Sequence, residues 1–401
     1  MVQASTFSHV KSSGSDTTVG SGRSLLVWTI WVVLLVAGLL GLWQRFVFGH
    51  NAAGYGSYVP WGIWIALYFM GVAIAGGTFV FGAAGYILGW PGFDTKADLR
   101  LAIVLSVSAI LPAFMVIWLD LGRMDRLHMV FTSATFTSMI AFNAWMYNSF
   151  LVVAVLSWLL SFKAESVWLK PLLCLGAFLS ILFPSQSGVF FEAVGTKEYW
   201  NSPLLSMMFL SSALAAGAGS LLMVRVLSHR RAGSSESESE SDEAIRKLRV
   251  ITVLALLVYL AFEFAELSIA VWRPYSENRA VEYLIYGGYW WVFWIVQLFI
   301  GAAIPLALYV MSESRTAWAV SSVLLIVGFV AARLGILVPG QVVGQIPGLQ
   351  HAFQDMRLVY SYHPSSMEYL IGALMVAVGM AVFYVGRRLT GALAAKTEQR
   401  A

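Results

Sequence analysis

The chain alternates between long apolar runs and short polar segments, and ten of the runs have the length of a membrane-spanning helix. A span needs about 20 mostly apolar residues. The runs that meet this condition cover residues 24–47, 59–90, 99–121, 137–162, 167–188, 202–228, 248–272, 284–311, 317–339 and 365–387. Because backbone in hydrocarbon must satisfy its own hydrogen bonds, these runs are predicted to be helices. The sequence therefore predicts an all-α integral membrane protein with ten transmembrane helices.

Composition supports the same class of protein. Of the 401 residues, 59% are hydrophobic and 11% are charged, whereas soluble domains carry about 25% charged residues. The net charge of +4 comes from basic residues that flank the apolar runs. This arrangement does not indicate a nucleic-acid partner.

The distribution of basic residues predicts how the chain is oriented. An even number of spans puts both termini on one side of the membrane, and most of the 25 Lys and Arg residues fall on that side. The positive-inside rule then places both termini in the cytoplasm. We expect residues 1–23 and 391–401 to be polar cytoplasmic tails around a transmembrane domain, 24–390. The Ser- and Glu-rich segment 229–247 is expected to be a disordered cytoplasmic loop.

Two runs are interrupted by charge, and the interruptions lie at similar depths. Glu263 and Glu266 occur in run 248–272, and their i, i+3 spacing puts both on roughly one helix face. Arg333 occurs in run 317–339. A charged residue at mid-helix costs about 2.5–3.5 kcal/mol on insertion scales, so such residues usually mark a site or a pathway. In the predicted orientation all three lie in the outer half of the membrane.

The other polar residues of the runs have the same one-sided placement. They lie at outer span ends or, for Gln297, about halfway through a span, and they are Asp120, Arg123, Asn143, Trp145, Gln186, Gln297 and Glu368. Two interpretations remain open. The acids could form ion pairs with Arg333 that hold helices together, or the groups could line a buried site that opens to the outer face. The clustering on one side favours the site.

Several kinds of cofactor site are not supported by the residues. The lone Cys174 excludes an intrinsic iron–sulfur cluster, which needs about four thiolates. The six histidines, His9, His50, His128, His229, His351 and His363, lie in loops or at span ends, so no pair is placed to ligate a transmembrane haem. No zinc-ligand spacing and no nucleotide fingerprint occur. We therefore expect no intrinsic haem, iron–sulfur cluster or metal.

Two functional classes fit a polar cluster of this kind. A quinone pocket needs an apolar, aromatic cavity together with groups that exchange protons and hold the ring carbonyls. A secondary transporter or ion-translocating module uses acids as coupling sites, usually near the midplane and often with internal repeats. The outward displacement of the polar groups and the absence of a clear repeat favour the quinone pocket. The acids also do not trace a complete carboxylate relay across the membrane.

Several motifs resemble those of the NrfD/polysulfide-reductase family of membrane subunits. They are "GSYVPWGIWIALYFMGVAIAGGTFVFGAAGYILG" at 56–89, "WLDLGR" at 118–123 and "LFPSQSGVFFEA" at 182–193, followed by "EFAEL", "AARLG" and "SSMEYLI". The resemblance covers about residues 25–390. The ten-span form is similar to the branch found in periplasmic hydrogenases, sulfate-reducer redox complexes and alternative complex III.

The resemblance implies a haem-free and cluster-free subunit built on two four-helix bundles with two further helices. Such a subunit binds menaquinone or ubiquinone near the outer face of a bacterial or archaeal cytoplasmic membrane. It exchanges electrons with an iron–sulfur subunit docked on the periplasmic side, which is joined to a catalytic subunit or a multihaem cytochrome. The chain would then carry out the quinone half-reaction only within its complex.

Carried over by position, the candidates for quinone and proton handling are Asp120, Arg123, Gln186, Glu266, Arg333 and Glu368, with Glu263, Asn143 and Trp145 beside them. Of the two acids, Glu266 is the preferred candidate because its position better matches the acid of the family. The histidine of one family motif is replaced here by Ser185, so His128 or His363 is expected to take that role. The small residues of the second span, Gly71, Ala75, Gly76 and Gly77, predict close helix approach.

Overall fold

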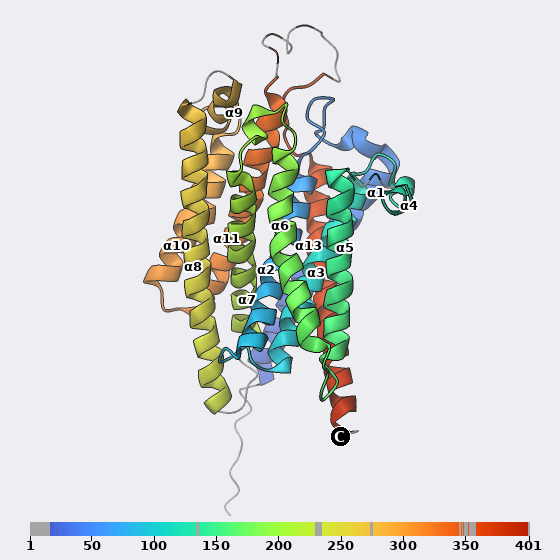
Figure 1. Ribbon diagram of the computed structural model, residues 1–401, viewed down its shortest axis with the longest axis vertical. Coiled ribbons are helices and arrows are strands. Elements are labelled where there is room, and N and C mark those ends of the chain that lie inside the picture. Colours follow the sequence, from blue (N-terminus) through green and yellow to red (C-terminus); the bar gives the residue numbers. More distant parts are fainter. Residues whose placement is uncertain are drawn as a thin grey trace, which may run out of the picture.

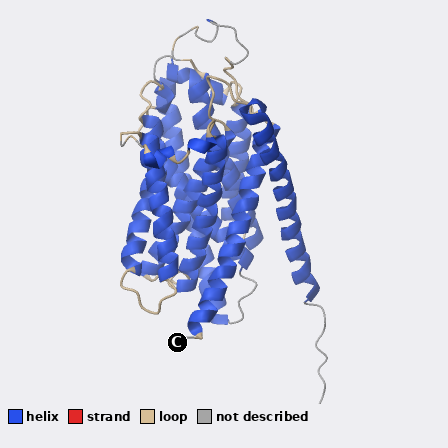
Figure 2. Ribbon diagram, turned by 90° about the vertical axis from the view of Figure 1, so that its right-hand side faces the viewer, coloured by secondary structure: helices blue, strands red, loops and turns tan. Residues whose placement is uncertain are grey.

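The computed structural model describes residues 17–399, except 134, 136, 229–234, 273–275, 345, 347, 349–351 and 353–357. Helices form all the regular structure of these residues (Figure 2). Ten of the helical segments are long and apolar enough to cross a membrane, which confirms the predicted all-α, ten-span architecture.

The spans follow one another along the chain, and short helices lie in several of the connections. The long helices are α1 (Thr17–Phe48), α2 (Ile63–Leu88), α3 (Lys96–Asp120), α5 (Met139–Leu160), α6 (Leu169–Glu192), α7 (Leu204–Ser228), α8 (Ser235–Trp272), the π-helical η5 (Val292–Ala303) that continues into α10 (Ile304–Met311), α11 (Arg315–Val342) and α13 (Ser366–Glu398). The short elements are η1 (Gly49–Ala52), η2 (Met124–Arg126), α4 (Met129–Thr132), η3 (Glu198–Trp200) and α9 (Ser276–Ile285).

The spans are arranged as two bundles of four and one further pair, as the family resemblance implies (Figure 1). The first bundle consists of α2, α3, α5 and α6, and the second consists of α7, α8, η5–α10 and α11. Helices α1 and α13 pack along each other, and α13 packs on α3. We call the end at which α1 begins and α13 ends the basal end, and the opposite end, which carries α9, the distal end (Figure 1).

The two bundles meet where α2 crosses α7, and glycine makes this crossing possible. A Cβ atom added to Gly77 would lie 2.1 Å from the carbonyl oxygen of Ala213, and one added to Gly217 would lie 2.4 Å from the Cα of Gly77. No real side chain fits at such distances, so the two backbones are in direct contact. The close approach predicted from the small residues of the second span is therefore confirmed at Gly77.

The structure differs from the sequence prediction at the start of the seventh span. Residues 229–247 were expected to form a disordered loop, but α8 begins at Ser235; residues 229–234 lie outside the described part. Glu is a good helix former, and the ion pair between Lys247 and Glu243 (2.8 Å) joins successive turns. The local helix propensity of this segment therefore outweighs its low-complexity composition.

Candidate functional site

A small cavity lies in the distal half of the second bundle, and Glu263 and Glu266 of α8 line it. Its volume is about 20 Å³, and its other polar wall residue inside the spans is Gln297 of η5. Glu263 and Glu266 are 8% and 6% exposed. The i, i+3 spacing thus puts the two carboxyl groups at one site, as predicted from the sequence.

The carboxyl group of Glu263 is held at one oxygen and free at the other. Its Oε1 accepts hydrogen bonds from the Tyr259 hydroxyl (3.0 Å), one turn earlier on α8, and from Nε2 of Gln297. Its Oε2 is buried and has no hydrogen-bond partner among the described residues. A buried carboxylate oxygen without a partner is costly. The cavity therefore contains an unsatisfied acceptor that water or a ligand can satisfy.

The carboxyl group of Glu266 is engaged differently. The hydroxyl of Ser202, just before α7, donates a hydrogen bond to its Oε2. Ser202 itself is buried, so this bond links the start of α7 to the distal turns of α8. Both acids line the cavity, and Glu263 carries the buried oxygen without a hydrogen-bond partner among the described residues, whereas the family resemblance favoured Glu266.

Gln297 reaches the acids from an unusual element. It lies in the middle of η5, a π-helical segment of 12 residues. π-Helical turns are rare, and those found inside α-helices are frequently at functional sites. Helices η5 and α8 have little backbone contact with each other, whereas each packs on a neighbour within the bundle. The Gln297–Glu263 hydrogen bond therefore joins two helices of the second bundle that otherwise have little contact.

Arg333 of α11 is a buried positive charge in the same bundle. Its side chain is 1% exposed, its guanidinium lies 3.8 Å from the centre of the Phe209 ring, and its Nη2 donates to the Ser212 hydroxyl. Its charge interacts with that of Glu263, but no direct ion pair joins them. Nε and Nη1 have no hydrogen-bond partner among the described residues. The guanidinium is thus buried with unused donors.

Gly335, which has no side chain, forms part of the cavity wall. A Cβ atom at Gly335 would lie 3.3 Å from a methyl group of Leu284 and 3.6 Å from Oε1 of Gln297. A volume of about 20 Å³ exceeds the ~10–15 Å³ that one water molecule needs, and it is far below the ~300–1,000 Å³ typical of small-molecule sites. The polar groups suit a quinone carbonyl, but the space admits a water molecule and not a quinone ring.

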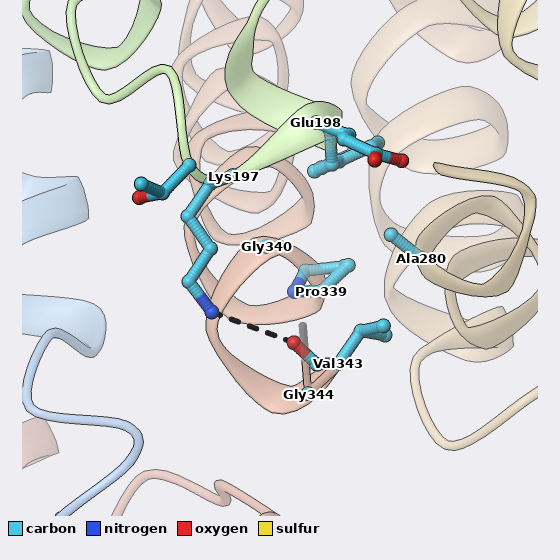
Figure 3. A pocket seen from close by; sticks show the side chains of 9 residues that line it. Lys197, Glu198, Ala280, Pro339, Gly340, Val343 and Gly344 are labelled. Atoms are coloured by element: carbon cyan, nitrogen blue, oxygen red, sulfur yellow. Dashed lines mark hydrogen bonds between the residues drawn. The ribbon is translucent and has the colours of Figure 1, made fainter. Parts of the chain in front are cut away.

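A second cavity, of about 50 Å³, lies at the distal surface next to the start of η3 (Figure 3). Lys197 extends along it and donates a hydrogen bond to the carbonyl oxygen of Val343 (3.4 Å). Burial lowers the pKa of the Lys197 ammonium group from its usual value. Tyr199 lines both cavities, and its hydroxyl donates to the carbonyl oxygen of Gly335 (2.9 Å). Tyr199 is therefore a shared wall of the surface cavity and the acid-lined cavity.

Two of the predicted site residues belong to a separate network, where α3 and α13 meet the loop after α1. Asp120 accepts a hydrogen bond from the Tyr55 hydroxyl (2.6 Å). Glu368 is fully buried and accepts bonds from the Tyr362 hydroxyl (2.5 Å) and from the backbone N–H of Gly54 and Ser365 (2.8 Å each). Together with the Ser365 side chain it forms a capping box at the start of α13. Both carboxyl oxygens of Glu368 are thus used by the fold.

The two tyrosines of this network are held in their neutral form. Burial raises the pKa of Tyr55 well above its usual value, and the charges of Asp120 and Glu368 raise it further. Burial also raises the pKa of Tyr362, again with a contribution from Glu368. Both hydroxyls therefore remain donors to the carboxylates throughout the physiological pH range.

The other predicted residues are distributed over the distal face and the first bundle. Arg123 pairs with Asp125 (3.3 Å) at the surface, and His128 and His363 are exposed. Trp145 is 43% exposed and packs edge-on against Phe131. These residues do not join the acids of the second bundle.

Two predicted polar residues lie in the first bundle. Asn143 is buried, and its Oδ1 has no partner among the described residues. Gln186 is half-buried within α6, which continues to Glu192, beyond the predicted end of this span at residue 188. The predicted single cluster is therefore divided among the second bundle, the α13 cap, the first bundle and the distal surface.

Three residues of the acid-lined site were not among the candidates. Tyr259 stands four residues before Glu263, a spacing at which helix side chains meet, so a sequence signal for it existed. Ser202 and Tyr199 lie in the loop and short helix before α7, and nothing in the local sequence connects them to α8. Among the described residues, no group of three or more His, Cys, Asp and Glu side chains could hold a metal ion.

Comparison with known proteins gives one family and several relatives. The family model described as polysulphide reductase, NrfD, matches residues 50–345. A selenate reductase subunit of Mesobacillus selenatarsenatis is 21% identical over 90% of this chain and 92% of that protein. The Hdr-like menaquinol oxidoreductase integral membrane subunit of Archaeoglobus fulgidus is 24% identical over 92% and 94%, respectively. Protein NrfD of Escherichia coli is 22% identical over 52% of this chain and 71% of that protein.

Proposed function

Since this chain belongs to the NrfD polysulphide reductase family, we propose that it is the quinone-interacting membrane subunit of a multi-subunit redox complex. The names of its relatives support this proposal, because one belongs to a selenate reductase and another is the integral membrane subunit of a menaquinol oxidoreductase. Both align with nine-tenths or more of the chain.

In this proposal an iron–sulfur subunit docks on the distal face and exchanges electrons with quinone bound in that half of the membrane. The iron–sulfur subunit in turn contacts a catalytic subunit or a multihaem cytochrome. The excess of basic residues at the basal end supports a periplasmic position of the distal face. Exposed groups such as Arg123, His128 and Trp145 offer contacts for such a partner on that face.

Within this function we assign the acid-lined cavity to proton exchange. When bound, a quinone supplies chemistry in which two electrons move together with two protons. The observation that carries the assignment is the unpartnered Oε2 of Glu263, which is buried beside a space for water. The cavity is too small for the ring, so the ring binds elsewhere in the distal half.

Each neighbour of Glu263 has a positioning role in this proposal. Gln297 and Tyr259 fix Oε1 and leave Oε2 as the atom that takes up or releases a proton. The charge of Arg333 interacts with this carboxyl group. Tyr199 separates the cavity from the distal surface cavity, through which protons reach the outside. Glu266, fixed by Ser202, is the second acid along this path.

Purification of the chain from its native membrane tests the proposed function. We expect an affinity-tagged chain to co-purify with an iron–sulfur subunit and extractable quinone, and the complex to oxidise quinol or reduce quinone. Recovery of a lone chain that drives substrate uptake in vesicles would contradict the proposal and support a secondary transporter. A chain without partner, quinone or uptake would also contradict it.

A further inference from the structure

A further cavity lies at the basal end, away from the acids of the second bundle. It is a groove of about 440 Å³ between α2 and α8. Phe81 of α2 and Phe93 of the following loop line one side, and Leu248, Val250 and Ile251 of α8 line the other. This volume lies within the ~300–1,000 Å³ range of small-molecule sites. The space is therefore large enough for a flexible apolar ligand.

The groove follows from how the helices pack. α7 packs against both α2 and α8, whereas α2 and α8 have little contact with each other. Phe81, Phe93 and Leu248 of the lining belong to an apolar core cluster that also contains Leu221 and Leu222 of α7. Val250 on the α8 side is 53% exposed. The groove is thus an apolar opening between α2 and α8 at the basal end.

The basal rim of the groove is positively charged. Arg246 and Lys247 line it together with Glu243 and Trp90. Lys247 is paired with Glu243 at 2.8 Å, while Arg246 is exposed and has no hydrogen bond or ion pair with a described residue. Arg246 is therefore a guanidinium without a partner among the described residues, at the basal rim of an apolar groove. A ligand that complements both the guanidinium and the apolar groove is an anion that carries an apolar chain.

We propose that this groove is a binding site for an anionic glycerophospholipid. The phosphate of the headgroup contacts Arg246 at the rim, and one acyl chain lies between Phe81, Phe93 and Val250. A soluble phosphate would use the rim and leave the apolar lining in contact with water, so the lining favours a lipid. Basic pockets between spans at the cytoplasmic side are known to bind anionic headgroups. The proposal does not depend on the quinone function.

Native mass spectrometry of the purified full chain, titrated with phosphatidylglycerol or phosphatidylcholine, tests the charge contribution. We expect the wild type to retain one phosphatidylglycerol more tightly than phosphatidylcholine. Arg246→Gln is expected to weaken that retention about fivefold, in line with the effect of one basic residue near a membrane surface. Arg387→Gln, an exposed arginine near the end of α13, is the matched control and is expected to change nothing.

A second pair of variants tests the acyl-chain contact. Val250→Trp fills the groove, and we expect it to abolish retention of the tightly held lipid. Val258→Trp, at an exposed position of α8 (47%) outside the groove lining, is the control and should retain it. The proposal would be overturned if the wild type retained both lipids equally or if Arg246→Gln and Arg387→Gln had equal effects. It would also be overturned if the Val250→Trp variant bound lipid like the wild type. A tightly bound polypeptide or inorganic phosphate in place of lipid would overturn it as well.

Discussion

The side-chain amide of Gln297 donates a hydrogen bond to Oε1 of Glu263 and joins η5 to α8, two helices whose backbones have little contact. The other carboxyl oxygen of Glu263 is buried and has no partner among the described residues. The acid is therefore fixed in position and still has a free oxygen. A proton-exchanging group needs both properties, because the carboxyl must stay in place while its proton is transferred.

Replacing Glu263 by Gln tests the proton role directly. The amide keeps a similar shape but cannot exchange the proton. We expect kcat of quinone-coupled turnover in the intact complex to fall about 10²-fold or more, KM for quinol to change little, and the pH dependence of kcat to flatten. Glu266→Gln is the matched variant and should have a smaller effect. Unchanged turnover across pH for Glu263→Gln would remove this residue from proton transfer.

Replacing Gly335 by Ala tests whether the cavity holds water or a quinone ring. The added Cβ would lie 3.3 Å from Leu284 and 3.6 Å from Gln297, so it fills space without a severe clash. If water in the cavity serves proton transfer, kcat falls and KM for quinol stays constant. A rise in KM with unchanged kcat would instead identify the cavity as part of the ring site. Gly391→Ala, where nothing lies within 4 Å, is the control.

The sequence predicted the parts of the fold that depend on one helix at a time. The apolar runs are long enough to identify all ten spans, and the i, i+3 spacing correctly placed Glu263 and Glu266 at one site. The π-helical geometry of η5 could not be predicted, because a uniformly apolar run does not distinguish one helix type from another. Gln297 was therefore noted only as a polar residue about halfway through its span.

The grouping of polar residues from different spans was harder to predict, because depth in the membrane says nothing about lateral neighbours. Glu368 lies in the same distal half of the protein as Glu263, yet it caps α13 and accepts a hydrogen bond from Tyr362. Asp120 lies at the same junction and bonds to Tyr55. A local signal for the cap existed in "SSME", since a Ser followed three residues later by Glu is the capping-box pattern. This local pattern distinguishes Glu368 from the acids of the second bundle.

A double-mutant cycle tests the electrostatic link between Arg333 and Glu263. The two charges interact without a direct ion pair, so removing one changes the effect of removing the other. We expect Arg333→Met and Glu263→Gln to show a coupling of about 0.5–3 kcal/mol in kcat or thermal stability. The pair Arg333→Met and Asp120→Asn spans two networks and should be additive within about 0.5 kcal/mol. Additivity in both pairs would exclude the proposed role of Arg333.

Alkaline unfolding tests the burial of Tyr362. Its pKa is raised in the folded protein, so above pH ~10 the unfolded chain ionises this tyrosine and the folded chain does not. The contribution of this tyrosine to stability is fully present below that pH. It falls as the pH rises further, by about 1.4 kcal/mol per pH unit. In thermal unfolding in detergent from pH 8 to pH 11, the stability of Tyr362→Phe should fall less steeply with rising pH than that of the wild type. At pH 8 this variant should be less stable than the wild type, because Glu368 loses a hydrogen-bond donor.

The control for this measurement is Tyr286→Phe, because Tyr286 is 82% exposed. We expect that variant to follow the wild-type curve at every pH. Parallel curves for Tyr362→Phe and the wild type would show that Tyr362 ionises equally in the folded and unfolded chains, which contradicts its burial beside Glu368.

The contact between the two bundles at Gly77 predicts a large effect from a very small substitution. In Gly77→Ala the new methyl group would lie 2.1 Å from the carbonyl oxygen of Ala213. Because that neighbour is backbone, α2 and α7 must separate, and overpacking of this kind costs about 1–3 kcal/mol. Thermal unfolding of the purified chain should therefore show a clear loss of stability. Gly391→Ala, in open space on α13, should be neutral or stabilising by up to about 1 kcal/mol. Equal stability of Gly77→Ala and the wild type would mean that the bundles do not meet at this crossing.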